Sequence, residues 1–230
     1  MAMNAGAGGL TIDRMNALRL RWIPISLILL SLIPMGGGAF RVTQLASGAE
    51  LTEANARFFG QPIPVLLHIF GASTFLVLGA FQFDAALRRN RTAWHRFAGR
   101  IVIPCGLIAA LSGVWMALFY DMPAAYEGTL TWVRVFFGSA MAAALLAGFA
   151  AIRRRDYATH RAWMMRGYAI GMGAGTQAFT LGAVLIFQDP PTGVGVLAGH
   201  VAGWVINLAV AEWFIRRSVA ARPRRLALHP

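Results

Sequence analysis

The sequence predicts an all-α integral membrane protein, a bundle of six transmembrane helices with both chain ends in the cytoplasm. Its 230 residues are 57% hydrophobic and 13% charged, with a mean hydropathy of +0.58, which is more apolar than soluble domains usually are. Apolar runs recur along the whole length, and arginines gather in alternate connections between them. The runs predict membrane spans, and the arginines predict how the spans are oriented. We therefore expect a single membrane domain over residues 1–230.

Each apolar run is long enough to cross the bilayer core as a helix, which takes about 20 residues. The apolar residues are continuous rather than alternating, so we expect helices and not the strands of a membrane barrel. The first run follows a basic segment, as the core of a secretion signal does, but it is longer than such a core. We expect it to remain as an uncleaved helix. The predicted spans are residues 20–40, 63–84, 97–119, 131–152, 164–187 and 194–215.

The basic residues, all 21 of them arginines, set the orientation. With the N-terminus inside, 18 of them fall on the cytoplasmic side, while Arg41, Arg57 and Arg134 fall outside. This places the protein in the bacterial inner membrane with both termini cytoplasmic. The formal charge of +12 does not indicate nucleic acid, because the arginines punctuate apolar helices instead of forming one basic domain. The expected partners are the lipid bilayer and a redox partner or another membrane subunit.

Two histidines, His68 and His200, lie inside apolar runs. An ionisable side chain in a membrane span is costly, and it is by default a functional hypothesis. Both lie roughly 8–9 Å below the outer membrane edge at the rise of a helix. Two imidazoles at one depth are what a haem needs for its two axial ligands. The alternative is two unrelated histidines, each hydrogen-bonded to a neighbouring helix.

A second pair, His95 and His160, occurs in the matched phrases AWHRFAGR and ATHRAWMMR at the predicted inner boundary. One interpretation is a second pair of haem ligands, with Arg96 and Arg161 neutralising haem propionates or binding lipid phosphate. The other is that these are interfacial polar residues beside arginines that extend toward the headgroups.

Other motifs limit the chemistry. The single cysteine, Cys105, excludes a disulfide framework, and no CxxCH motif is present, so any haem would be held without covalent attachment. No pair of carboxylates falls in mid-membrane, which argues against a carboxylate-driven ion pump. Glycine series at 167, 171 and 175 and at 195, 199 and 203 predict close helix packing, and they also leave room for a flat ligand.

Three phrases carry a resemblance over residues 63–180. These are LLHIFGASTFLVLGAFQF, HRFAGRIVIPCGLIAALSGVWMA and HRAWMMRGYA. In this combination they resemble a bacterial family of predicted multi-pass membrane proteins of unknown function. The chain is more distantly similar to the di-haem transmembrane cytochromes, which move electrons from ascorbate or quinol. That likeness implies haem b held by His68 with His200 and by His95 with His160. Here, however, the histidines fall on spans 2, 3, 5 and 6 instead of on four consecutive helices.

Three functions therefore stay open at the level of the sequence. The first is a haem b electron-transfer protein with His68 and His200 as ligands. The second is a transporter whose histidines bind a small solute, a metal ion or a proton. The third is a structural or accessory membrane subunit whose histidines only pack.

Overall fold

The chain is all-helical wherever the computed structural model describes it, which is over residues 6–122, 128–188 and 193–226. The predicted all-α class is thus confirmed for these residues. The predicted outer turns at 121–128 and 188–193 lie largely outside them. The helices are α1 (Gly6–Ser47), α2 (Ala56–Gly60), α3 (Pro62–Gln82), α4 (Ala85–Asn90), α5 (Thr92–Phe119), α6 (Thr129–Arg153), α7 (Tyr157–Gly171), α8 (Gly173–Phe187) and α9 (Gly193–Leu226).

Five helical segments in the described residues are long and apolar enough to cross a membrane, and α7 with α8 makes a sixth if the bent pair is one span. Each overlaps one of the runs expected from the sequence. The differences lie at the ends: α1 continues to Ser47, and α5 begins at Thr92. The five segments are Trp22–Ser47, Pro62–Gln82, Thr92–Phe119, Thr129–Arg153 and Gly193–Ser218.

The main difference from the sequence prediction concerns the helix expected over residues 164–187. The structure starts it at Tyr157 and breaks it at Met172, where α7 and α8 meet at 41°. Glycines flank the break and bring neighbouring helices close. A Cβ atom on Gly171 would lie 2.7 Å from the Phe75 ring, and one on Gly175 would lie 2.5 Å from the Leu30 carbonyl oxygen. Glycine also lowers helix stability by about 1 kcal/mol per residue relative to alanine.

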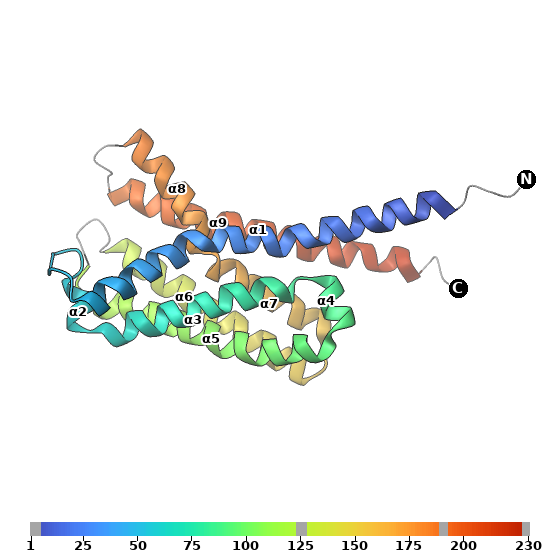
Figure 1. Cartoon of the computed structure of the whole chain (residues 1–230), viewed down its shortest axis with the longest axis horizontal. Helices are drawn as coiled ribbons and strands as arrows, with labels where there is room; N and C mark the ends of the chain where they lie inside the picture. The colour runs from blue at the N-terminus through green and yellow to red at the C-terminus, as the bar shows by residue number, and fades with distance from the viewer. Residues whose placement is uncertain (1–5, 123–127, 189–192, 227–230) are drawn as a thin grey trace, which may run out of the picture.

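The two ends of the bundle are marked by short helices (Figure 1). The start of α1, the end of α9 and α4 lie at one end, which we call the α4 end, whereas α2 lies at the other, the α2 end. The two ends of the described chain are thus at the same end of the bundle. Arg41, Arg57 and Arg134 belong to the α2 end, since they lie in the last turns of α1, in α2 and early in α6. Which end faces the cytoplasm stays a prediction.

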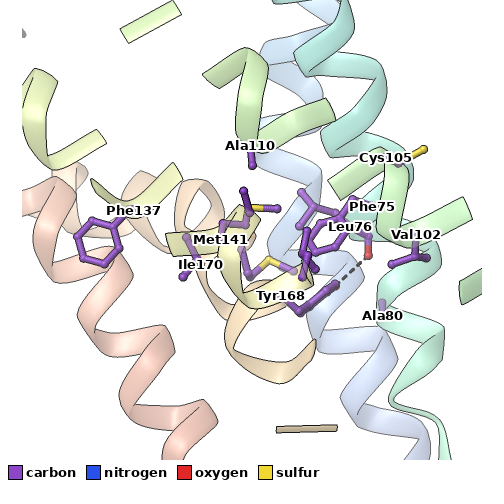
Figure 2. Packing of buried hydrophobic residues seen from close by; sticks show 13 residues of the cluster. Phe75, Leu76, Ala80, Val102, Cys105, Ala110, Phe137, Met141, Tyr168 and Ile170 are labelled. Atoms are coloured by element: carbon purple, nitrogen blue, oxygen red, sulfur yellow. Dashed lines mark hydrogen bonds between the residues drawn. The ribbon is translucent and has the colours of Figure 1, made fainter. Parts of the chain in front are cut away.

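A filled core joins α3, α5, α6 and α7 (Figure 2). Phe75 is 1% exposed and Leu145 is fully buried. Tyr168 packs against Phe75, and its hydroxyl donates a hydrogen bond to the Leu76 carbonyl oxygen at 2.8 Å.

The glycine series at 195, 199 and 203 was predicted to allow close helix packing. Gly199 and Gly203 on α9 face Leu181 and Gln177 on α8, and a Cβ atom on Gly203 would lie 2.5 Å from the Gln177 side chain. The predicted role in close helix packing is confirmed for this pair of helices.

Candidate functional site

Three of the four intramembrane histidines share one hydrogen-bonding pattern. Nδ1 lies 2.8 Å from a backbone carbonyl oxygen in each: Ala109 for His68, Gly148 for His160 and Val196 for His200. A carbonyl only accepts, so Nδ1 carries the hydrogen and donates it. Nε2 of each neutral ring is then an acceptor, and in His200 it already accepts a hydrogen bond from Arg134.

His68 is held between α3 and α5 at the edge of a cavity. The hydroxyl oxygen of Ser112 lies 3.3 Å from Nδ1 and donates its own hydrogen to the Ile108 carbonyl oxygen at 2.6 Å. Gly113 leaves room for the ring, since a Cβ atom there would lie 3.3 Å from it. The sequence predicted a buried histidine, and the structure places it in the wall of an open space.

That space, which we call the large chamber, has a volume of about 320 Å³. It lies toward the α2 end, and residues of α2, α3, α5, α6, α7, α8 and α9 line it. Five polar side chains line it, and the described lining residues include no carboxylate. The rest of the wall is mostly apolar, with Met116, Met141, Ile170 and Trp204. The five polar residues are Arg57, His68, Tyr120, Arg134 and Gln177.

Arg57 is the least satisfied side chain in this wall. Its Nε and one terminal nitrogen are buried and make no hydrogen bond to any described residue. Its guanidinium carbon lies 4.6 Å from the centre of the Phe58 ring, and that of Arg41 lies 4.0 Å from the same ring. Burying an unpaired cation is costly, so this arrangement favours a site completed by an acceptor.

Tyr120 closes the α2 end of the chamber. Its hydroxyl donates to the Gln61 carbonyl oxygen at 2.7 Å, and its ring packs edge-on against Phe58. Burial raises the pKa of Tyr120, while a backbone hydrogen bond at Val65 and the charge of Arg57 act in the opposite direction. Tyr120 is therefore neutral at physiological pH and does not itself balance the positive charge of the arginines.

His200 is not part of the lining of the large chamber. It is 7% exposed, and its Nε2 accepts a hydrogen bond from Arg134 at 3.2 Å. Trp204, one helical turn away, stands in the chamber wall in its place. The predicted outer pair is thus divided: His68 faces the chamber, and His200 lies behind Arg134 with both ring nitrogens already in hydrogen bonds.

The inner pair lies at the α4 end. His95 and His160 are each the fourth residue of a helix. Nδ1 of His95 is buried without a hydrogen-bond partner among the described residues. Arg88 of α4 acts on His95, a neighbour that the sequence did not predict.

Positive charge accumulates around this pair. The pKa of Arg88 is lowered by burial first and then by Arg161 and Arg89, against the opposing effect of Asp84. The two arginines predicted as phosphate or propionate contacts, Arg96 and Arg161, are both exposed, and the charge of Arg161 reaches Arg88.

Sequence reasoning missed Arg57 and Arg134 as site residues, although it contained the signal. They are two of the three arginines on the predicted outer side, where positive charge is scarce. The third, Arg41, stacks on the same Phe58 ring as Arg57. Two of the three arginines predicted to lie outside thus line the large chamber, and the third packs on Phe58 in its wall.

The family described as "Predicted membrane protein (DUF2306)" matches residues 65–215. The chain belongs to this family. The match runs from α3 to α9 and includes Arg134 and the four candidate histidines, whereas α1 and Arg57 precede it. The expected resemblance to membrane proteins of unknown function is confirmed, and the one to di-haem cytochromes stays a prediction. No curated protein and no solved structure matches the chain.

Proposed function

We propose that this DUF2306 protein binds a small amphipathic organic anion in the large chamber. The observation that carries the proposal is the Arg57 guanidinium, which has two buried nitrogens without hydrogen-bond partners in the described structure. A carboxylate or phosphate oxygen satisfies such donors with charge-assisted hydrogen bonds, which are stronger than neutral ones.

The charge of the chamber favours an anion over a neutral ligand. Arg57 and Arg134 both line it, and Arg41 lies just behind Phe58. The described lining residues include no carboxylate. Because opposite charges attract strongly in a site shielded from water, a bound anion relieves the repulsion among these cations.

The rest of the wall favours an apolar body on that anion. Methionines, Ile170 and Trp204 make up much of the lining, and the volume of about 320 Å³ is in the range of small-molecule sites. Nε2 of His68 adds an acceptor for a hydroxyl group. With the orientation predicted from the arginines, the chamber lies toward the side away from the cytoplasm, as it would for a receptor or a carrier.

The test is equilibrium binding to the purified full chain in nanodiscs of zwitterionic lipid. We expect hexyl phosphate and hexanoate to bind and hexanol to bind at least about 10-fold more weakly. Arg57→Gln should weaken binding of both anions by about 10- to 100-fold, the equivalent of charge-assisted hydrogen bonds. Arg91→Gln, at the exposed edge of α4, is the matched control. Equal binding of hexanol, or unchanged affinity in Arg57→Gln, overturns the proposal.

Haem b is a second candidate, favoured by the hydrogen bond from His68 to the Ala109 carbonyl oxygen. Histidines that bind metals commonly donate their other nitrogen in this way. His68 would supply an axial ligand, Arg57 and Arg134 would meet the propionates, and haem would supply one-electron chemistry. His200 fits less well as the second ligand, because Arg134 engages its Nε2. Among the described residues, no three His, Cys, Asp or Glu side chains gather as a metal site.

An absorption spectrum decides this candidate. Protein produced with haem supplied should show a reduced b-type spectrum that His68→Ala weakens. A spectrum free of haem bands excludes the cofactor and leaves the anion proposal in place.

A further inference from the structure

A second, smaller chamber of about 120 Å³ adjoins the large one. Both are lined by five of the same residues, so they meet along a shared wall. His68 stands at this junction, with the cationic chamber on one side and the smaller chamber on the other. The shared residues are His68, Ala109, Met141, Gly171 and Ala174.

The chemistry of the wall changes across the junction. Arginines line only the large chamber. Apart from the shared His68, the smaller one has Ser73 as its single polar lining residue in the described structure. The remainder includes Met35, Ile69 and Ala72. A ligand that occupies both chambers therefore has a charged end and an apolar end.

Helix α1 forms one side of the smaller chamber and is the least buried of the unbroken spans. Pro34, Met35 and Gly38 of α1 form one wall of it, opposite α3. In the most apolar stretch of α1, 11% of the residues are buried, whereas the share is 33% in each of the other four unbroken spans. Three consecutive glycines, Gly36 to Gly38, lie at this level. Each weakens the helix by about 1 kcal/mol relative to alanine, so α1 itself is less rigid at this position.

From this arrangement we infer that the ligand is a single-chain anionic lipid, whose charged group lies at Arg57 and Arg134 and whose chain passes beneath α1 toward the bilayer. This rests on the proposed function and adds the ligand class and a lateral route of entry. A chain leaving between α1 and α3 remains in contact with apolar surface along its length, which stabilises it in proportion to the area buried.

The test compares two ligands that share a headgroup, hexyl phosphate and hexadecyl phosphate. Binding is measured on the full chain in zwitterionic nanodiscs, and partition into empty nanodiscs is subtracted. We expect the longer ligand to bind at least about 10-fold more tightly, since each additional buried methylene contributes about 0.8 kcal/mol.

Ala72→Phe fills the smaller chamber, because Ala72 lines it and not the large one. This variant should weaken the binding of hexadecyl phosphate by about 10-fold and leave the binding of hexyl phosphate unchanged. Ser73→Leu is the second variant in the same wall, in case Ala72→Phe does not fold. Ala143→Phe, on an exposed position of α6, is the matched control and should change neither affinity.

Arg57→Gln separates the two levels of the proposal. It should weaken both ligands, whereas the chamber-filling variants should weaken only the longer one. If Arg57→Gln acts and the filling variants change neither ligand, or change both equally, the lipid inference is overturned and anion binding stands. If Arg57→Gln also leaves both affinities unchanged, the proposed function fails with it.

Discussion

Arg134 on α6 donates a hydrogen bond to Nε2 of His200 on α9 over 3.2 Å. The same guanidinium lines the large chamber, and Nδ1 of His200 donates to the Val196 carbonyl oxygen within α9. This contact ties the wall of the candidate site to the last spanning helix. It explains His200 as a residue that positions Arg134.

Removing Arg134 should therefore lower the stability of the protein as well as its affinity for the ligand. Arg134→Met takes away the donor to a buried imidazole, and we expect the free energy of unfolding to fall by about 1–3 kcal/mol. Unfolding of the full chain in detergent, followed by circular dichroism, measures the change. His200→Phe and the double variant complete a mutant cycle, in which a positive coupling energy is expected. Strictly additive effects would contradict the proposed pairing.

The buried tyrosine of the core gives a graded prediction. Tyr168 is 5% exposed and donates to the Leu76 carbonyl oxygen. Tyr168→Phe keeps the ring and should cost about 1 kcal/mol, whereas Tyr168→Ala leaves a cavity and should cost about 3–5 kcal/mol. The same unfolding measurement applies, with Tyr157→Phe on the exposed start of α7 as the control. Equal losses for Phe and Ala would show that ring packing contributes little.

Two glycines with opposite surroundings test the packing of the bundle. A Cβ atom on Gly106 would lie 2.6 Å from the Phe75 ring, while nothing lies within 4 Å of one on Gly182. Gly106→Ala should destabilise by about 1–3 kcal/mol through overpacking. Gly182→Ala should stabilise by up to about 1 kcal/mol, because alanine favours the helix. Melting temperatures that move in the same direction for both would refute this packing.

The start of α7 should respond to acid through Asp156. Its side chain accepts from the Thr159 amide at 3.0 Å, and hydrogen bonding to Thr159 holds its pKa below the usual value. A lowered folded-state pKa means that the stabilisation is present at neutral pH and is lost as the pH falls from about 4 through the folded value. Asp156→Asn retains a capping side chain without the titration.

Comparing the wild type with Asp156→Asn isolates the titration of Asp156, because the two proteins share all other carboxylates. Melting temperatures measured from pH 7 to pH 3 should converge on acidification, as the wild type loses the advantage of its charged cap. Curves that stay parallel over the whole range would contradict a titrating cap at this position.

The helices were largely predictable because hydropathy is a local property. A run such as 131–152 is apolar in any fold, and its helix spans Thr129–Arg153. The break at Met172 was not predictable in the same way. The three glycines around the break are compatible with a continuous helix in lipid. The bend depends on the residues that pack against them, which are Phe75 at Gly171, Trp204 at Gly173 and Leu30 at Gly175.

The candidate site was predictable in part. His68 was correctly singled out for its cost inside a membrane, and it lies in the chamber wall. Its pairing with His200 across a haem stays a prediction, and the structure gives His200 a different neighbour in Arg134. Depth along a helix follows from residue counting, but the direction in which a side chain points also depends on how that helix is rotated against its neighbours.

The sequence by itself determined the membrane class, the positions of the apolar helices and the scarcity of arginine on one side. These depend on the free energy of each segment in lipid or water, to which every residue contributes separately. Only the tertiary structure decided that Arg57 and Arg134 share a chamber with His68 and that α1 covers its apolar extension. These residues are far apart in the chain, and only the packing of their helices brings them together, leaving Nε and one terminal nitrogen of Arg57 without a partner in the described protein.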